Sequence, residues 1–487
     1  MQHGTEKSAF TGLFYRPEGA FLGDVVPYCE DGKYYIFYLR DPRDTGIPVD
    51  HISWGLLVTE DFVTFEDFGV VLPAGDVSEH DNCIYTGSVF REAPGKYHIF
   101  YTANNNQSPA FRIDGKPVQT VMHAVSTDLV HWTKDRSFSF GSDGERYEIW
   151  DWRDPFVYRD EENGLYRMLL CARLAGKSPR RGGIVLSCSS NDLRTWEIGE
   201  PFYAPDRYSA HECPDLFRMG DWWYLVYSTF SDRCATHYRI SAGPEGPWRA
   251  MQPDTFDARA FYAAKTAGEG DRRFAFGWLP TRHEGNGFAP FDWGGSLVVH
   301  ELKQGPDGTL FPVIPDAVLR YFGRETDLLP QGTGEDGLLL SAREGYAGVP
   351  IAKLADECLL TCCLQPAPGT QSYGLFLQEG EDPDSGFFFR VDPFHRRLVL
   401  DRFPRNERGS AEPPFLAEFE RPLDLPEGEP AVFRLVKKED CAVLYVSDRA
   451  ALSVRLCPLP KGPLLIFAED GEVRILSCSA GVPCREG

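Results

Sequence analysis

The sequence predicts an all-β protein in which an N-terminal five-bladed β-propeller is followed by a C-terminal β-sandwich. The first observation is a glycine that leads into an aromatic-rich strand and recurs five times between residues 32 and 270. The second is a pair of shorter patterns that recur at similar places around that glycine. The third is composition, because 13% aromatic residues together with 47 Gly and 37 Pro are typical of many short strands joined by turns.

The repeated unit is centred on a tight turn. The glycines of this turn are Gly32, Gly95, Gly164, Gly220 and Gly270. A short apolar strand opened by a polar residue precedes each glycine, and a polar turn ending in an aromatic residue comes later, as in 125–132 and 189–196. Each unit reads as four strands, and five such units predict a five-bladed propeller. The alternative is an all-β sandwich whose spacing is coincidental.

A second part of the chain begins where the repeat ends, near Leu302. The Gly- and acid-rich stretch 328–337 is the expected junction. Alternating apolar segments bounded by turn residues then predict a β-sandwich. These segments are 359–365, 373–379, 386–392, 397–403, 431–437, 442–448 and 463–469. We therefore expect a propeller in residues 1–320 and a sandwich in residues 321–487, the latter stabilising the propeller or shaping one side of its pocket.

Three acids stand where the innermost strands of blades one, three and four begin. Asp24, Asp154 and Glu212 precede their glycines by 8, 10 and 8 residues. Innermost strands line the central channel and begin at one end of it, so the three carboxyl groups are expected to face one another. Blades two and five carry small or neutral residues at this place, in 86–88 and 262–264, which leaves room for a ligand.

Carboxyl groups held close together cannot all ionise, so an acid and a base arise in one site. Glycosidic bond cleavage needs this pair, because one carboxylate attacks the anomeric carbon and one carboxyl protonates the leaving oxygen. Asp24 is the expected nucleophile. Taken singly, each acid is more typical of a turn or a local salt bridge; their shared position in the repeat favours chemistry.

Several neighbours of the acids are candidates for substrate binding. Arg153 is placed to hold Asp154 ionised or to bind a sugar hydroxyl, and a structural role is its alternative. The roles of His211 and Asp215, which flank the Glu212 motif, stay open in the same way. Most tryptophans fit the blade pattern as packing residues, but Trp54 follows the long loop 41–51, rich in Asp, Arg and Pro, and is expected to contact substrate.

Charge and cysteine usage exclude several function classes. A formal charge of -22 argues against nucleic acid or an anionic membrane as a partner. No signal-peptide pattern opens the sequence, and no apolar run reaches the roughly 18 residues that span a bilayer. The 13 Cys have no paired C-x-x-C spacing and the 11 His form no H-E-x-x-H motif, so we expect reduced thiols, a cytoplasmic protein and neither a metal nor a cofactor.

These residues resemble glycoside hydrolase family 32, the β-fructofuranosidases. The three signatures of that family correspond to Gly23-Asp24, to Trp152-Arg153-Asp154-Pro155 and to Glu212-Cys213-Pro214. The resemblance implies that Asp24 is the nucleophile, Glu212 the acid/base and Asp154 the transition-state stabiliser, with retained anomeric configuration. It also implies that substrate-binding residues include Arg153, Trp54, Ser88, Tyr262 and Trp278.

Two departures concern the terminal sugar. The family usually has Asn where Gly23 stands and Gln where Leu39 stands, and neither Gly nor Leu can replace the hydrogen bonds of an amide. We expect a retaining exo-glycosidase that releases terminal β-fructofuranosyl residues from sucrose-like sugars or short fructo-oligosaccharides. The alternatives are a related furanosidase acting on arabinofuranosides or difructose-type sugars, a fructosyltransferase, a non-catalytic sugar-binding propeller and a scaffold for protein partners.

Overall fold

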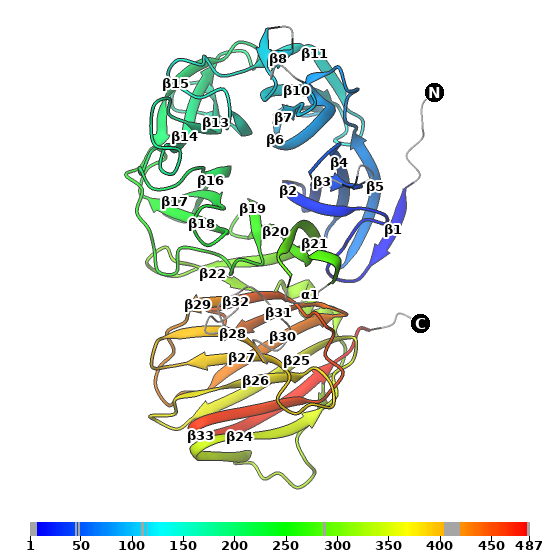
Figure 1. The fold of residues 1–487 in the computed structure, drawn as a ribbon, viewed down its shortest axis with the longest axis vertical. Helices are drawn as coiled ribbons and strands as arrows, with labels where there is room; N and C mark the ends of the chain where they lie inside the picture. Colours follow the sequence, from blue (N-terminus) through cyan, green and yellow to red (C-terminus); the bar gives the residue numbers. More distant parts are fainter. Residues whose placement is uncertain are drawn as a thin grey trace.

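The computed structural model describes residues 7–43, 46, 49–108, 112–113, 115–285, 289–403 and 419–484. Figure 1 shows a ring of small sheets that lies beside a stack of long strands. The all-β prediction, with a propeller followed by a sandwich, is confirmed. Helical structure in the described residues is limited to α1 (Asp316–Tyr321) and the short 3-10 turns η1 (His80–Asn82) and η2 (His283–Gly285). None of these helices is long and apolar enough to cross a membrane.

Blades one to three follow the predicted four-stranded order, from the channel outward. Blade one contains β2 (Phe21–Glu30), β3 (Lys33–Asp41), β4 (Ser53–Thr59) and β5 (Thr64–Leu72), with β1 (Ser8–Thr11) at its outer edge. Blade two contains β6 (Cys83–Ala93), β7 (Lys96–Asn104), β10 (Thr120–Ser126) and β11 (Thr133–Phe140), with the small hairpin β8 (Arg112–Ile113) and β9 (Lys116–Pro117) inserted. Blade three contains β12 (Arg153–Asp160), β13 (Leu165–Arg173), β14 (Gly183–Ser190) and β15 (Glu197–Tyr203).

Blades four and five differ from the simple pattern. Blade four has β16 (Glu212–Met219), β17 (Trp222–Thr229) and β18 (Ala235–Ser241), and isolated bridges such as Ile240 to Arg249 stand in for a fourth strand. Blade five has β19 (Tyr262–Ala267), β20 (Arg273–Arg282), β21 (Phe291–Gln304) and β22 (Leu310–Val313). The long strand β21 also pairs with β2, which joins the last blade to the first and closes the ring.

The five repeated glycines form the predicted turns between first and second strands. All five have a positive φ, between 55° and 75°. Only glycine adopts this region without strain, so the recurrence of glycine in the sequence has a direct backbone cause.

The sandwich is built around β33 (Leu464–Gly481), which pairs with β26 through its first residues and with β25 through its last. Two layers therefore share one bent strand. The other strands are β23 (Thr326–Asp327), β24 (Leu338–Ala352), β25 (Glu357–Pro366), β26 (Ser372–Gln378), β27 (Gly386–Asp392), β28 (Arg397–Phe403), β29 (Phe419–Pro422), β30 (Ala431–Lys438), β31 (Cys441–Val446) and β32 (Ala450–Arg455). The division between residues 320 and 321 stays a prediction; it falls within α1.

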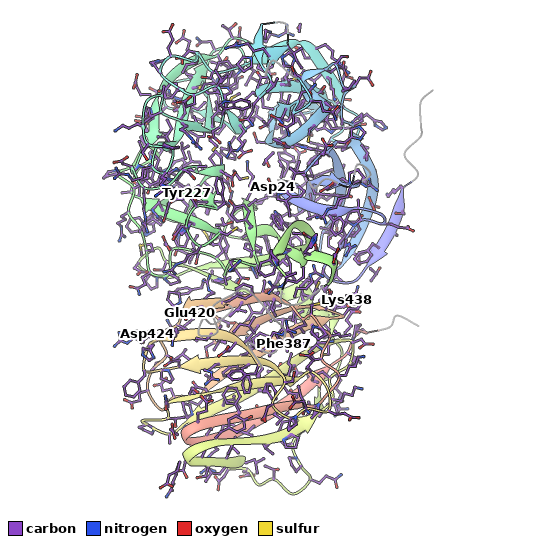
Figure 2. All side chains as sticks on the ribbon, in the orientation of Figure 1. Asp24, Tyr227, Phe387, Glu420, Asp424 and Lys438 are labelled. Atoms are coloured by element: carbon purple, nitrogen blue, oxygen red, sulfur yellow. The ribbon has the colours of Figure 1, made fainter. Side chains whose placement is uncertain are left out.

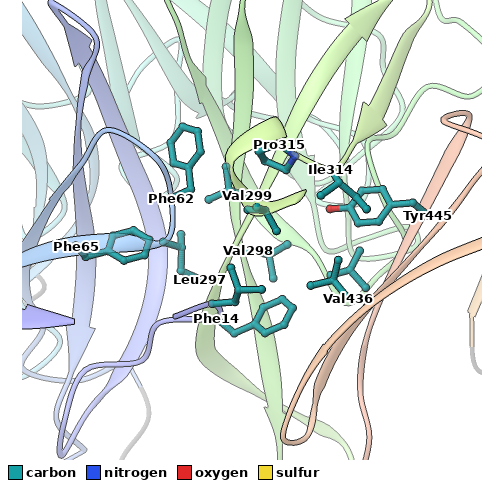
Figure 3. Close-up of a pocket in the computed structure, with 13 residues that line it drawn as sticks. Phe14, Phe62, Phe65, Leu297, Val298, Val299, Ile314, Pro315, Val436 and Tyr445 are labelled. Carbon is teal, nitrogen blue, oxygen red and sulfur yellow. The ribbon is translucent and has the colours of Figure 1, made fainter. Parts of the chain in front are cut away.

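A continuous apolar core connects the two parts. One buried cluster runs from Tyr224 and Val298 in the propeller to Leu435 and Leu444 in the sandwich. Between them lies an apolar pocket of about 40 Å³, lined by residues such as Val298 and Tyr445 (Figure 3). This volume is far below that of a small-molecule site, so the pocket is a packing gap of the interface rather than a sugar site.

Candidate active site

The innermost strands of all five blades share one irregularity. Pairing with the second strand shifts by one residue within a four-residue window of each blade, a β-bulge. The windows are 22–25, 84–87, 153–156, 212–215 and 262–265. A bulge turns successive side chains out of strict alternation. It allows Asp24, Asp154 and Glu212 to point into one site although they are the third, second and first residues of their windows.

Asp24 lies inside the ring of blades (Figure 2) and has a defined orientation. The Thr86 hydroxyl donates to its Oδ2 at 2.7 Å, and the Trp278 indole Nε1 donates to its Oδ1 at 3.0 Å. The pKa of Asp24 is raised to about 7, chiefly by burial and also by the nearby carboxylates of Asp154 and Glu212, while the two hydrogen-bond donors oppose the shift. Asp24 can therefore hold or release its proton near neutral pH.

Asp154 is buried, and Cys213 lies between its carboxylate and that of Asp24. The Cys213 backbone N–H donates to Asp154 Oδ2 at 2.9 Å, and its Sγ lies 3.8 Å from that oxygen and 3.9 Å from Asp24 Oδ2. The backbone N–H of Asp154 donates to Thr102 Oγ1 at 2.7 Å. Burial raises the pKa of Asp154, and Glu212 adds to this shift, whereas Arg153 opposes it.

Glu212 is held by two donors from neighbouring blades. Arg153 Nη2 donates to its Oε1 at 2.9 Å, and the Tyr262 hydroxyl donates to its Oε2. Arg153 Nε also lies 3.7 Å from Asp154 Oδ2, and its Nη1 pairs with Asp151. Arg153 thus connects two of the three acids, which favours the functional over the purely local interpretation of this residue.

The structure brings together five of the predicted residues besides Asp24, namely Asp154, Glu212, Arg153, Tyr262 and Trp278. Trp54 is a correction, because it is 0% exposed, packs against Phe37 and donates to Tyr85 O at 3.1 Å. Its indole turns into the core between blades and does not face the acids. Residues 44–45 and 47–48 of the loop before it lie outside the described residues.

Ser88 is a second correction. It is buried, and its Oγ accepts a hydrogen bond from the Val157 backbone N–H at 3.0 Å, so it joins blades two and three. The two residues left open are also structural. His211 is fully buried against Tyr227, and Asp215 accepts from Thr266 N at 2.8 Å.

Sequence reasoning missed three residues of the site floor. The sequence pattern marks Thr86 only as a small residue, although Thr86 stands in the same window position as Asp24. Cys213 lies between two carboxyl groups. Lys265 is buried in the blade-five window and its Nζ donates to Gly87 O at 2.8 Å across the channel. Among the described residues, no three His, Cys, Asp or Glu side chains are arranged to hold a metal ion.

Comparisons with known proteins point to one family and one fold. A family model described as "Glycosyl hydrolases family 32 N-terminal domain" matches residues 16–303. Sucrose-6-phosphate hydrolase of Escherichia coli is 24% identical over 466 residues, covering 90% of this chain and 87% of that protein. Raffinose invertase of Escherichia coli is 27% identical over 485 residues, covering 91% and 88%. Fructan 1-exohydrolase IIa from Cichorium intybus has the same fold, with a TM-score of 0.74 at 16% identity over 99% of this chain and 98% of that one.

Proposed function

Because this chain belongs to glycosyl hydrolase family 32, and is thus a glycoside hydrolase of the fructofuranosidase type, we propose that it is a retaining exo-glycosidase. It releases terminal β-fructofuranosyl residues from sucrose-like sugars or short fructo-oligosaccharides. The observation that carries the proposal is the pair Asp24 and Glu212, two carboxyl groups of one buried site that are held by different sets of donors.

In the first step, an ionised Asp24 oxygen attacks the anomeric carbon of the terminal sugar. The bond from that carbon to the leaving oxygen breaks, and Glu212 gives its proton to that oxygen. The product is a glycosyl ester on Asp24 and a free leaving sugar. Hydrogen bonds from Thr86 and Trp278 orient the carboxylate of Asp24, so that little reorganisation is needed at the moment of attack.

In the second step, the ionised Glu212 takes a proton from water, and the resulting nucleophile attacks the same carbon. The ester bond breaks, and Asp24 leaves as a carboxylate, so two inversions give net retention. Arg153 and the Tyr262 hydroxyl stabilise the charge that Glu212 carries between the steps. Asp154 accepts hydrogen bonds from sugar hydroxyls and stabilises positive charge on the ring.

A substrate screen with product identification tests this proposal. We expect fructose from sucrose and from inulin-type oligosaccharides, with the β-anomer formed first when the reaction is followed by NMR. Glu212→Gln should lower turnover by roughly 10²–10⁴-fold, the contribution of general acid–base catalysis. Release of arabinose, transfer to a second sugar as the main reaction, or an unchanged rate in Glu212→Gln would contradict the proposal.

A second candidate substrate carries an anionic leaving group. A cavity of about 660 Å³ is lined by Arg207, Arg233 and Arg259 and by Cys234. Cys234 also packs against the cluster that contains Tyr262, the donor to Glu212, which supports a leaving group that departs toward this cavity. Three arginines together are notable in a chain of charge -22.

The carboxylates that line the same cavity are already engaged. Asp254 pairs with Arg239 at 2.7 Å, Asp257 with His300 at 3.0 Å, and Glu420 with Arg397 at 2.8 Å, while Asp232 accepts from the Tyr208 hydroxyl at 3.2 Å. This leaves the arginines to bind a phosphate on the leaving sugar, as in the substrate named for the sucrose-6-phosphate hydrolase relative.

Competition between sucrose and its 6-phosphate ester tests this candidate. A phosphate site predicts a KM for the ester at least tenfold below that for sucrose. Arg233→Ser should remove that difference and leave the KM for sucrose within about twofold. Equal KM values in the wild type would favour the neutral substrate.

We also propose a cytoplasmic location. All thirteen cysteines are free thiols in the structure, and most of them are buried. Such thiols persist in a reducing compartment. Fractionation of the host cells, with activity measured in each fraction, tests the proposal.

A further inference from the structure

Gly23, which directly precedes the nucleophile, has no room for a side chain. A Cβ built there lies 1.9 Å from Cη2, 2.3 Å from Cζ2 and 2.6 Å from Cζ3 of Trp293. Gly23 is not among the glycines with positive φ, so its backbone does not require glycine. The requirement is steric: the indole of Trp293 occupies the volume that any other side chain at position 23 would need.

The Trp293 ring is fixed from both sides. Its residue lies near the start of β21, two positions before the bridge between Leu22 and Gly295, and Arg43 Nη2 donates to its carbonyl oxygen. The ring packs against Trp278 with centroids 5.7 Å apart and an interplanar angle of 56°. Trp278 is the residue whose Nε1 binds Asp24, so the indole of Trp293 is one ring away from the nucleophile.

The surroundings of Trp293 offer contact area rather than hydrogen bonds. Trp293 is half-buried and keeps part of its surface accessible, and Tyr262 continues the aromatic wall on the other side of Trp278 with a centroid distance of 6.0 Å. Leu39 is buried in the adjacent apolar cluster. An aromatic face binds the C–H face of a sugar and discriminates only weakly between sugars that differ in one hydroxyl.

We propose that Trp293, given room by Gly23, is the specificity-determining residue for the terminal sugar of this chain. The substrate class is a furanoside whose terminal ring lays a C–H face on this indole and tolerates the loss of single hydroxyls that do not contact Asp154. The inference rests on the proposed function, in which Asp24 attacks that terminal ring. Gly23 and Trp293 act as one unit, because either residue alone determines the space available to the other.

Kinetics with sucrose and with analogues that lack one hydroxyl of the fructosyl ring test the specificity. In the wild type, kcat/KM for analogues that lack a hydroxyl other than those bound by Asp154 falls by no more than about 10–200-fold, the range for a pocket built on apolar contact, and not by 10⁴-fold or more. Trp293→Ala should raise the KM for sucrose at least tenfold, with a smaller change in kcat, and Trp293→Phe should lie between. An unchanged KM in both variants, or rejection of every analogue by 10⁴-fold, overturns the inference.

A double-mutant cycle tests the steric unit. Gly23→Ala should displace the indole and raise KM about as much as Trp293→Ala, and the same substitution in the Trp293→Ala background should add little. If the effects of the two substitutions on KM are additive, Gly23 and Trp293 do not act as one unit. Gly243→Ala is the matched control, since a Cβ there meets nothing closer than 3.7 Å, and it should leave KM unchanged.

The cycle also separates this inference from the proposed function. If the wild type hydrolyses sucrose but Trp293 variants keep its KM, the inference alone fails. If the wild type hydrolyses no furanoside, the proposed function fails, and the specificity role fails with it. Thermal unfolding of the same variants reports whether a loss of activity is a loss of folding. If Trp293→Ala unfolds, the KM of the more conservative Trp293→Phe variant tests the inference instead.

Discussion

Asp24, which is half-buried, and Asp257, which is fully buried, are two carboxylates with opposite behaviour. Burial and its carboxylate neighbours together raise the pKa of Asp24 to about 7. Asp257 is 2% exposed, and burial alone would raise its pKa, but hydrogen bonds from His300 and Ser453 hold the pKa below its usual range. Burial is common to both, so the neighbours decide the sign of the shift.

The difference separates the proposed catalytic site from a structural one. Asp257 accepts from His300 Nε2 at 3.0 Å and from Ser453 Oγ at 2.6 Å, and His300 in turn bonds the Tyr445 hydroxyl at 2.8 Å. This satisfied network joins propeller to sandwich. Asp24 shares its site with two other acids and is poised to change charge, which is a cost to folding that catalysis requires.

The largest expected effect is on turnover. Asp24→Asn should lower kcat by roughly 10⁴-fold or more, because an amide cannot form the ester. The measurement is fructose release under saturating substrate, with circular dichroism to verify folding. The matched control is Asp257→Asn, whose folded fraction should keep kcat within about threefold. Residual activity of Asp24→Asn within tenfold of the wild type would remove the contrast.

For stability we expect the opposite order, with the larger loss in Asp257→Asn and not in Asp24→Asn. Asp257→Asn removes a buried carboxylate that accepts hydrogen bonds from His300 and Ser453 between propeller and sandwich, and it should lower the free energy of unfolding by about 3–5 kcal/mol. Urea unfolding at pH 7 measures it. Asp24→Asn should be neutral or stabilising in the same assay, since it replaces a carboxyl that burial disfavours in its charged form. Equal losses in both variants would contradict this comparison.

The two carboxylates should also respond oppositely to pH. The pKa of Asp24 is raised in the folded state, so its contribution is complete below about pH 4 and is lost as the pH rises through about 7. The pKa of Asp257 is lowered, so its contribution is present above about pH 4 and is lost as the pH falls below that value. Between pH 5 and pH 8, the wild type should lose a few kcal/mol relative to Asp24→Asn, since one pKa unit corresponds to about 1.4 kcal/mol. A pH-independent difference would show that Asp24 does not titrate in this range.

The smallest expected effect is the loss of one donor to Asp257. Ser453→Ala removes the 2.6 Å hydrogen bond and leaves His300 and the backbone N–H in place. It should lower the free energy of unfolding by about 1–2 kcal/mol. Kinetics at pH 7 should not change, because the residue lies in the sandwich. A loss as large as that of Asp257→Asn would show that the Ser453 hydroxyl, and not the hydrogen bond with His300, dominates the interface.

Much of the site was predictable because it repeats. Asp24, Asp154 and Glu212 could be aligned through the glycine turns, whose positive φ gives the repeat a local physical cause. The predictions that Trp54 and Ser88 contact substrate were wrong because no repeat determines where these side chains point. Both are polar-tipped residues of regular strands, and whether such a side chain faces the channel or a neighbouring blade depends on packing between blades, which no local pattern encodes.

The sequence by itself determined the blade count, the order of the two parts and the three acids, since each follows from local turn chemistry and from a pattern that recurs along the chain. Only the tertiary structure decided which groups surround those acids. Thr86 and Trp278 reach Asp24 from other blades, and the indole of Trp293 explains Gly23 through a contact between strands 270 residues apart. Packing between blades creates these contacts: Thr86 comes from the adjacent blade two, whereas Trp278 and Trp293 become neighbours of Asp24 and Gly23 only because the last blade pairs with the first.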